Sequence, residues 1–387
     1  MARKQVKRAI TLAGGGPAAG LSVGALERLQ EDARIRFDVW SSACVGAWTM
    51  VAYHTADRGQ EIAQTKAFYH RVFRPDAWYD RFPIASVFTP DWYRMAQNTI
   101  AFVTDPRNYR NLVVPDQIWD AMESVARFMT DPRQWGPGGF NFMMLNSVLA
   151  PNPVVRFWTS LLYESQTKGL SRVYEPDSPL LSKLDFDRLY DSDKPVLYHN
   201  SYNLTRQRME LFCNRYAYFN RTYGRVYRKI DAKSLVACSA LPYIEEPVEI
   251  DGETFCEGAV IDTVNFDNLV KDHPDLDEVW VSRILDLDQI KKPENLYDAL
   301  NNLVMLFAAT TSENDVKLFK HRVREQGLNI KVVDIPVSSQ TCFDWTYSNF
   351  QHSVTHSYWA TDHVLRRYWG GESNDLEGVL EQPLAAA

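Results

Sequence analysis

The segment up to Thr55 contains the pattern that most constrains the fold of this chain. Two strand–turn–helix units follow each other: strand Val6–Ala13, loop Gly14–Gly20 and helix Leu21–Asp32, then strand Arg34–Ser41, turn Ser42–Gly46 and an apolar helix to about Thr55. Both strands are short and the first helix places its leucines on one face. This repeated βα pattern predicts a parallel sheet with helices packed on its faces.

The composition excludes several classes of protein and of partner. Of the 387 residues, 45% are apolar and 24% are charged, so wholesale disorder, collagen-like and coiled-coil structures are excluded. The net charge of -7 argues against a nucleic-acid partner and leaves no broad basic surface for anionic lipid. We therefore expect no nucleic acid, and any contact with a membrane or lipid surface has to be local.

The cysteines and the N-terminal residues indicate a reducing, cytoplasmic location. The five cysteines, at positions 44, 213, 238, 256 and 342, are odd in number and lack the spacing of a disulfide framework or a zinc site. The basic start is followed by only Ala9–Ala13 as an apolar stretch, which is too short for a signal peptide. The uncharged run Gln134–Val155 contains six glycines and prolines, so it is not a membrane span. We expect no metal and no cofactor, and the oligomeric state is not readable from the sequence.

Residues 59–185 differ in character from the rest of the chain. Between Phe68 and Tyr174 there are 20 aromatic residues with weak periodicity, which predicts an inserted, aromatic-rich and mainly helical cap within a single domain of residues 1–387. The aromatic residues early in this insert either form the cap's own core, roof an acyl channel or contact a lipid surface. They are Phe68, Tyr69, Phe73, Trp78, Tyr79, Phe82, Phe88, Trp92 and Tyr93. Residues 372–387 are expected to form a flexible tail.

The α/β pattern resumes after the insert. Strands are expected at Pro195–Leu204, Arg208–Asn214, Glu278–Leu285 and Asn329–Ile335, and helices at Ala232–Ala240, Asn295–Ala309, Glu313–Gln326 and Ser348–Tyr368. Val248–Ile250 and Thr254–Cys256 are expected to form a hairpin, because the Asp251-Gly252 dipeptide between them favours a type I′ turn. Together with the opening βα units, these elements predict a mostly parallel sheet with helices on its faces.

Gly14, Gly15 and Gly16 lie between the first strand and the first helix. Consecutive glycines let backbone N–H groups point into one concavity, where an anion or a developing oxyanion is held. The loop also fits a variant of the dinucleotide-binding fingerprint, with Asp38 roughly where a ribose-binding acid belongs. A turn that only packs the helix on the strand is the third interpretation.

Cys44 lies in the segment Ser42-Ala43-Cys44-Val45-Gly46, at the end of the second strand. Small residues around one nucleophilic side chain are typical of a nucleophile elbow, in which a strained strand-to-helix turn exposes the central residue. The following helix begins next to Cys44, and the positive end of its dipole favours the thiolate form. A cysteine is most often buried and inert, but this context favours a nucleophile and argues against the dinucleotide site.

Glu257 is the candidate partner of Cys44. It lies directly after the expected hairpin in Cys256-Glu257-Gly258-Ala259, where two small residues let its carboxylate approach another loop closely. Alone, such a glutamate is usually a solvated turn residue, so it gains a catalytic role only together with Cys44.

These three segments, in this order, resemble the motifs of the patatin-like phospholipase family. The family has a Gly-Gly-Gly oxyanion loop, a Gly-x-Ser-x-Gly elbow and an Asp-Gly-Gly or Asp-Gly-Ala motif, and Ser239-Ala240-Leu241-Pro242 is similar to its Ser-Ala-x-Pro segment. The resemblance covers Val6–Thr55 and about Pro195–Tyr368. The departures are Cys44 for serine, Glu257 for aspartate, Ser42 for the first glycine of the elbow, and Ala18 for the usual arginine.

The resemblance implies a three-layer α/β/α fold and a catalytic dyad without histidine. We expect an acyl hydrolase or acyltransferase acting on lipid esters or acyl thioesters, with Cys44 as nucleophile and Glu257 as general base. The oxyanion hole is expected at Gly14, Gly15, Gly16 and Val45. The alternative is a patatin-like lipid-binding or scaffold protein with an altered site.

Histidines offer weaker alternatives to this dyad. His352 and His356 have the spacing of a zinc-binding helix, but no glutamate follows the first of them, so a plain helix face is favoured. His363, next to Asp362, is a candidate third member of a Cys-His-Asp arrangement. His54 follows the elbow helix, and packing is its favoured role.

Overall fold

The computed structural model describes residues 6–81, 92–109, 114–149, 151–152, 154–155, 159, 168–173, 178–290, 292–337 and 344–370. The chain divides into two compact units. The larger unit consists of Met1–Thr89 and Ser171–Ala387, and the smaller unit is Pro90–Leu170. The expected tail, 372–387, lies outside the described residues, as does Cys342.

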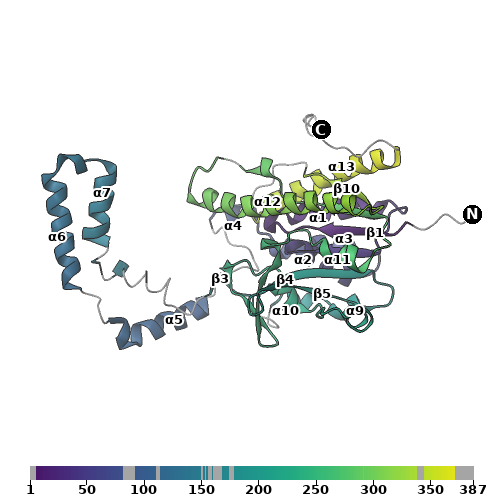
Figure 1. Cartoon of the computed structure of the whole chain (residues 1–387), viewed down its shortest axis with the longest axis horizontal. Helices are drawn as coiled ribbons and strands as arrows, with labels where there is room; N and C mark the ends of the chain where they lie inside the picture. Colours follow the sequence, from purple (N-terminus) through teal and green to yellow (C-terminus); the bar gives the residue numbers. More distant parts are fainter. Residues whose placement is uncertain are drawn as a thin grey trace, which may run out of the picture. The chain divides into compact units, whose positions relative to one another are not determined.

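The larger unit contains a mixed, mostly parallel sheet (Figure 1). Its described strands are β1 (Arg8–Leu12), β2 (Val39–Ser42), β4 (Val196–Asn203), β5 (Arg208–Cys213), β7 (Val248–Ile250), β8 (Glu253–Glu257), β9 (Glu278–Ser282) and β10 (Lys331–Ile335). Their order is β10-β9-β1-β2-β4-β8-β7, and β5 pairs with β4 outside this path. The first five strands of that path are parallel, whereas β5, β8 and β7 join antiparallel. Short strands β3 (Gly169–Ser171) and β6 (Tyr243–Glu245) lie outside this sheet.

Helices cover both faces of the sheet, as the alternation of side chains along the strands shows. Trp40 of β2 and Trp280 of β9 flank β1 and point to one face, where Trp40 contacts His54 of α2 (Val45–Thr55) and Trp280 contacts Tyr368 of α13 (Tyr347–Gly370). Ser41, the next residue of β2, points to the opposite face. There its hydroxyl donates to the Asn265 carbonyl, just before α11 (Asp267–Asp272), and to Asn268 within that helix. Successive residues of a strand face opposite sides of a sheet. The fold is therefore a three-layer α/β/α arrangement, as predicted.

The remaining helices of the larger unit extend these two layers. On the face of Trp40, α1 (Ala19–Glu31) packs against α13, and α3 (Glu61–Val72) packs against α2. On the other face, α12 (Leu296–Glu325) binds β10 through the ion pair of Lys320 with Asp334. The shorter helices are α4 (Asp76–Tyr79), α9 (Tyr216–Tyr223) and α10 (Ala232–Ala237). Parallel strands covered on both sides are buried, which explains the burial of every residue of β1, β2 and β9.

Two details test the sequence expectations for this unit. Asp251 and Gly252 both have positive φ, 52° and 76°, as a type I′ turn requires, so the predicted hairpin is confirmed. The two helices expected at Asn295–Ala309 and Glu313–Gln326 form one continuous helix, α12. That expectation was wrong because the polar residues between them do not interrupt the backbone hydrogen bonds, and Ser312 is buried.

The smaller unit is helical. Its described helices are α5 (Trp92–Thr104), α6 (Pro115–Thr130) and α7 (Pro137–Met144). Of the aromatic residues expected in a cap, Phe68, Tyr69 and Phe73 instead belong to the core of the larger unit. Phe82 and Phe88 lie outside the described residues. The role of 59–185 as a cap stays a prediction.

None of the helices within the described residues combines the length and the apolar character that crossing a bilayer requires.

Candidate active site

Cys44 occupies the strained turn between β2 and α2. Its backbone angles are φ 47° and ψ -126°, in a region that residues with a side chain rarely adopt. A strained conformation of this kind persists only where the surrounding structure holds it, and it is characteristic of catalytic elbows. The local geometry therefore matches the elbow that the small residues around Cys44 predict.

Side chains from two other segments hold this turn. The Tyr69 hydroxyl donates to the Val45 carbonyl at 3.2 Å and lies 2.7 Å from the Thr49 hydroxyl. The Cys238 thiol donates to the Cys44 carbonyl at 3.7 Å. Tyr69 comes from α3 and Cys238 follows α10, so elements on two sides of the elbow fix its backbone.

Gly14 shows that the three sequence motifs meet in space. A Cβ atom at this position would lie 2.8 Å from the Cys44 Cβ and 3.0 Å from the Ala259 Cβ. No side chain fits there without displacing the elbow or the Glu257-Gly258-Ala259 segment. The glycine loop, the elbow and the glutamate motif are therefore in mutual contact, although more than two hundred residues separate the first from the last.

Glu257 is the last residue of β8, and its carboxyl group lies close enough to the Cys44 thiol for each group to shift the pKa of the other. The Glu257 backbone N–H donates to the Ala240 carbonyl at 3.0 Å. Ala240 belongs to the Ser-Ala-x-Pro segment, whose Ser239 in turn accepts a hydrogen bond from the Trp48 indole at 3.0 Å. This segment thus connects the glutamate to the elbow helix.

Burial determines the electrostatics of the Cys44–Glu257 pair. It raises the pKa of Glu257 to about 7, although the hydrogen bond from Cys44 opposes this rise. Burial, and next the charge of Glu257, raise the pKa of Cys44 well above its ordinary value. Desolvation and the carboxylate therefore outweigh the effect of the helix N-terminus, which by itself favours the thiolate. At neutral pH the sulfur carries its proton and the neighbouring carboxyl group titrates, which is the arrangement of a thiol with a general base.

The glycine loop supplies candidate oxyanion donors. The Gly14 N–H donates to the Thr263 carbonyl at 3.3 Å, so it is engaged and packs the loop rather than facing the sulfur. Within the described part of the chain, no backbone carbonyl outside the regular elements accepts from the N–H groups of Gly15 or Gly16. Val45, the first residue of α2, follows Cys44 directly, and its N–H lowers the pKa of the thiol. We retain Gly15, Gly16 and Val45 as candidate donors.

Access to the dyad is narrow. The exposed fraction is 8% for Cys44 and 6% for Glu257. A pocket of about 560 Å³ lies elsewhere in the larger unit, and neither residue of the dyad lines it. Among the described cysteines Cys44 is still the most exposed, since Cys213 and Cys238 are fully covered and Cys256 is at 4%.

The structure disfavours the other candidate sites. Asp38 precedes β2 at the opposite end of the strand from the glycine loop, and its carboxylate accepts from the Arg8 N–H, so it cannot bind a ribose beside the loop. His54 is buried against Trp40, and burial lowers the pKa of its imidazole to about 3, which fits packing. His363 is exposed on α13.

The structure also disfavours a zinc site at His352 and His356, although their two rings lie side by side. No group of three or more histidine, cysteine or acidic residues within the described residues is arranged to hold a metal ion.

Sequence reasoning missed a second buried carboxyl group beside the dyad. Glu245 in β6 is 2% exposed, and burial together with the charge of Glu257 raises the pKa of its carboxyl group well above the ordinary value. Only the resemblance of the preceding Ser-Ala-x-Pro segment indicated that this region lies near the site. Two buried carboxyl groups close together resist simultaneous ionisation, so Glu245 is in its neutral form when Glu257 is charged.

Comparison with known proteins gave one family. A family model described as patatin-like phospholipase matches residues 10–270, which include the glycine loop, the elbow and the glutamate motif. Among solved structures, VipD from Legionella pneumophila is similar, with 14% identity and a TM-score of 0.39. That match covers 94% of this chain and 67% of VipD. No curated protein sequence matched the chain.

Proposed function

The chain belongs to the patatin-like phospholipase family, and from this premise we propose that it is a lipid acyl hydrolase with a Cys44–Glu257 dyad. The family implies lipid acyl hydrolysis, and the cysteine nucleophile and the glutamate base are the finer part of the proposal. The observation that supports them is the meeting of the three motifs: a Cβ at Gly14 would touch both Cys44, on its strained turn, and Ala259, two residues after the buried Glu257. The substrates are lipid esters or acyl thioesters.

The first half of the reaction transfers the acyl group to the enzyme. Glu257 takes the thiol proton as the Cys44 sulfur attacks the carbonyl carbon, and the carbonyl electron pair moves to oxygen. The N–H groups of Gly15, Gly16 and Val45 stabilise this oxyanion. When the oxyanion collapses, the bond to the leaving group breaks, and Glu257 returns the proton to the departing alcohol or thiol. The product is an acyl thioester on Cys44.

The second half releases the acyl group. A water molecule gives a proton to Glu257 and attacks the thioester carbonyl, and the sulfur leaves and regains the proton. A lipid alcohol in place of water makes the same step an acyl transfer. A carboxyl group with a pKa near 7 is suited to both directions, because it accepts and returns a proton at neutral pH.

The smaller unit supplies the local contact with a lipid surface. On α6, Ile118, Met122, Val125 and Met129 recur at the spacing of one helix face, and all four side chains are exposed. A different side of the helix packs against α7, since Phe128 contacts Phe140 of that helix edge-on. A continuous exposed apolar stripe of this kind favours insertion into the acyl boundary of a membrane or lipid particle.

Hydrolysis of p-nitrophenyl esters tests the dyad. We expect Cys44→Ala to abolish p-nitrophenol release and Cys256→Ala, a matched buried cysteine that the mechanism does not use, to retain it. We also expect iodoacetamide to modify Cys44 before the other described cysteines. If Cys44→Ala turns over esters at the rate of the wild type, the dyad is wrong. A protein that only binds lipid would bind it equally with either substitution and show no turnover.

A further inference from the structure

The pocket described above lies away from the Cys44–Glu257 dyad. The pocket of about 560 Å³ is formed by the start of β5, the segment around α11 and the middle of α12. Its size falls within the range of small-molecule sites. Within the described residues its lining includes neither Cys44 nor Glu257, and the proposed mechanism gives it no role.

Two asparagines in the wall of this pocket have unused hydrogen-bond donors. Asn265 and Asn268 both line it, and each is 1% exposed. Within the described part of the chain, the Nδ2 atom of each amide is buried and has no hydrogen-bond partner. Buried polar groups of proteins are almost always paired, so two adjacent unpaired donors call for an acceptor.

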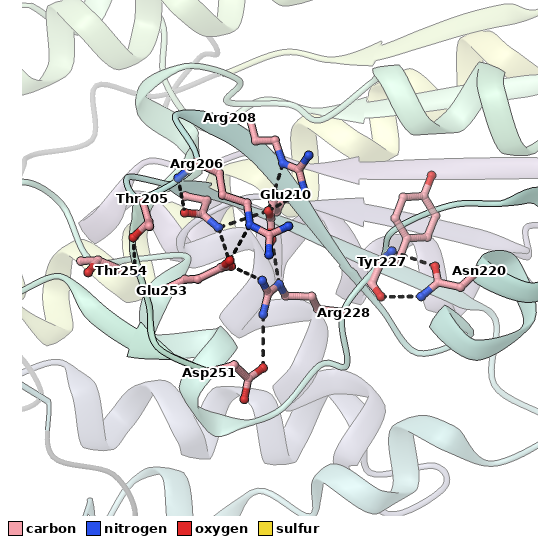
Figure 2. Close-up of polar contacts among 11 residues, drawn as sticks. Thr205, Arg206, Arg208, Glu210, Asn220, Tyr227, Arg228, Asp251, Glu253 and Thr254 are labelled. Atoms are coloured by element: carbon pink, nitrogen blue, oxygen red, sulfur yellow. Dashed lines mark hydrogen bonds and ion pairs between the residues drawn. The ribbon is translucent and has the colours of Figure 1, made fainter.

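The acids that line the pocket are already engaged. The Asp262 carboxylate accepts from the Asn265 N–H at 2.6 Å, and the Asp315 carboxylate accepts from the Thr263 N–H at 2.9 Å. Figure 2 shows the third acid, Glu210, held between the guanidinium groups of Arg208 and Arg228, at 3.0 and 2.7 Å. The three acids are therefore each partnered by donors of this chain, whereas the two asparagine amides keep unpaired donors.

The rest of the lining is apolar or cationic. Val226, Ile261 and Leu318 line the pocket and have half or more of their side-chain surface exposed, which gives it an apolar rim. Lys271 also lines it, and no carboxylate within the described residues forms an ion pair with its ammonium group. An apolar rim next to a lysine and two amide donors fits an apolar chain that carries an acidic oxygen group.

We propose that this pocket binds an amphiphilic carboxylate, a fatty-acid anion. The asparagine side chains turn toward the carboxylate when it binds, Lys271 pairs with its charge, and the chain lies along Ile261 and Leu318. The site is separate from the dyad, so its existence does not depend on the proposed hydrolysis.

A single residue, Thr263, connects the wall of the pocket to the glycine loop. Thr263 lies between Asp262 and Asn265, its N–H binds Asp315 of α12, and its carbonyl accepts the N–H of Gly14. Gly14 in turn packs against Cys44. A ligand that moves the wall therefore moves the support of the elbow, and we expect occupancy of the pocket to change the reactivity of Cys44.

Calorimetric titration with laurate below its micelle concentration tests the site. We expect the wild type and Cys44→Ala to bind laurate equally, and Leu318→Glu and Lys271→Glu to weaken binding at least tenfold. The matched controls are Leu303→Glu and Lys317→Glu, which change exposed residues of α12 outside the pocket. Acetate and dodecanol, which carry the charge or the chain alone, are expected to bind at least tenfold more weakly than laurate.

Three results would overturn the site. Equal losses in Leu318→Glu and Leu303→Glu would show that the pocket is not involved. Loss of laurate binding in Cys44→Ala would place the ligand at the dyad. Acetate binding as tight as laurate binding would reduce the site to a simple anion site.

The coupling has a separate test. We expect saturating laurate to change the rate of iodoacetamide modification of Cys44 at least threefold in the wild type, and to have no effect in Leu318→Glu. An unchanged rate in the wild type contradicts the coupling and leaves the binding site standing. Because alkylation reports the reactivity of the thiol and not turnover, this result is independent of whether the protein hydrolyses esters.

Discussion

At the scale of single residues, the proposed mechanism depends on a thiol that stays protonated beside a carboxyl group that titrates near neutral pH. Burial is the first cause of both pKa shifts. The base has to be ionised before it can take the thiol proton, so the active fraction of enzyme increases as the pH rises through about 7.

Replacing the base tests this dependence. We expect the wild-type rate of p-nitrophenyl butyrate hydrolysis to rise tenfold or more between pH 5 and 8. Glu257→Gln should lower the rate by about two to four orders of magnitude and remove the rise, because general base catalysis typically contributes that much. Glu249→Gln, an exposed glutamate of β7, is the control and should behave as the wild type. A Glu257→Gln enzyme that keeps the rise would assign the titration to another group.

The same carboxyl group makes stability depend on pH. The folded-state pKa of Glu257, about 7, lies above the ordinary value of 4.5, so the folded state binds the proton more tightly than the unfolded state. This contribution to stability is complete below pH 4.5 and is lost as the pH rises through 7. A difference of this size corresponds to about 3 kcal/mol.

We therefore expect Glu257→Gln to be more stable than the wild type by up to about 3 kcal/mol at pH 8, and to show little difference at pH 4.5. Urea denaturation at the two pH values measures this, with Glu249→Gln again as the control. A constant difference at both pH values would mean that the substitution acts through packing and not through ionisation.

The sequence predicted that Cys44 and Glu257 lie close together but did not predict the electrostatics of the pair. Small residues around Cys44 and after Glu257 are visible as a pattern, because close approach of two loops excludes larger side chains. The direction of the Cys44 pKa shift depends on burial, which no local pattern gives. Glu245 and Cys238 were missed for the same reason, since each acquires its role only from the chain that folds over it.

At the scale of secondary-structure elements, the closest helix contact in the larger unit is between α1 and α13. A Cβ atom at Gly24 of α1 would lie 2.1 Å from the Val354 carbonyl oxygen of α13. Space for a methyl group can arise only if one helix moves away from the other. This glycine therefore determines how closely the N-terminal and C-terminal helices pack.

A pair of glycine substitutions tests that packing. We expect Gly24→Ala to destabilise the protein by about 1–3 kcal/mol, the usual cost of overpacking. Gly138→Ala in α7 has no atom within 4 Å of the new methyl group and should be neutral or slightly stabilising, because alanine favours a helix. Thermal unfolding of both variants gives the comparison. A Gly24→Ala protein as stable as Gly138→Ala would show that the two helices do not pack this closely.

The elements themselves were predictable where turn chemistry or periodicity was local. Asp251-Gly252 identified the hairpin, and the glycine loop separated β1 from α1. The continuity of α12 was not predictable, since Ser312 looks like a break in an isolated sequence and is buried in the folded chain. Polar residues inside a helix are tolerated when tertiary packing covers them.

At the scale of the whole molecule, the exposed apolar side chains of α6 are the proposed contact with a lipid surface. The polar residues of this helix include Asp116, Asp120 and Glu123, so the helix is not attracted to anionic lipid by charge. Burial of the apolar side chains of α6 in the lipid is the remaining driving force. We therefore expect that binding of the protein to lipid vesicles depends little on ionic strength.

Vesicle sedimentation measures this binding. We expect Met122→Ser with Met129→Ser to lower partitioning into neutral phosphatidylcholine vesicles at least tenfold, because each buried large apolar side chain contributes about 1.5–3 kcal/mol. Trp359→Ser, which removes an exposed tryptophan of α13, is the control and should leave partitioning unchanged. Equal losses in both proteins would mean that α6 is not the contact surface.

Sites built from distant parts of the chain could not be predicted from the sequence. The pocket combines a strand beginning at Arg208, the residues around Asn265 and the helix face of Leu318, and no sequence window contains all three. The parallel core of the sheet was predictable because it follows from the βα pattern, whereas the order of its strands was not. The extent of the insert, the cytoplasmic location and the cap function stay predictions.

The mass of the intact protein during turnover tests the catalytic proposal most directly. The wild type, mixed with a p-nitrophenyl ester or an acyl thioester and quenched in acid, should gain one acyl group, and peptide mapping should place it on Cys44 as a thioester that hydroxylamine removes. Cys44→Ala should gain none. An acyl group on any other residue would contradict the Cys44–Glu257 dyad. So would ester turnover that forms no adduct and that continues in Cys44→Ala.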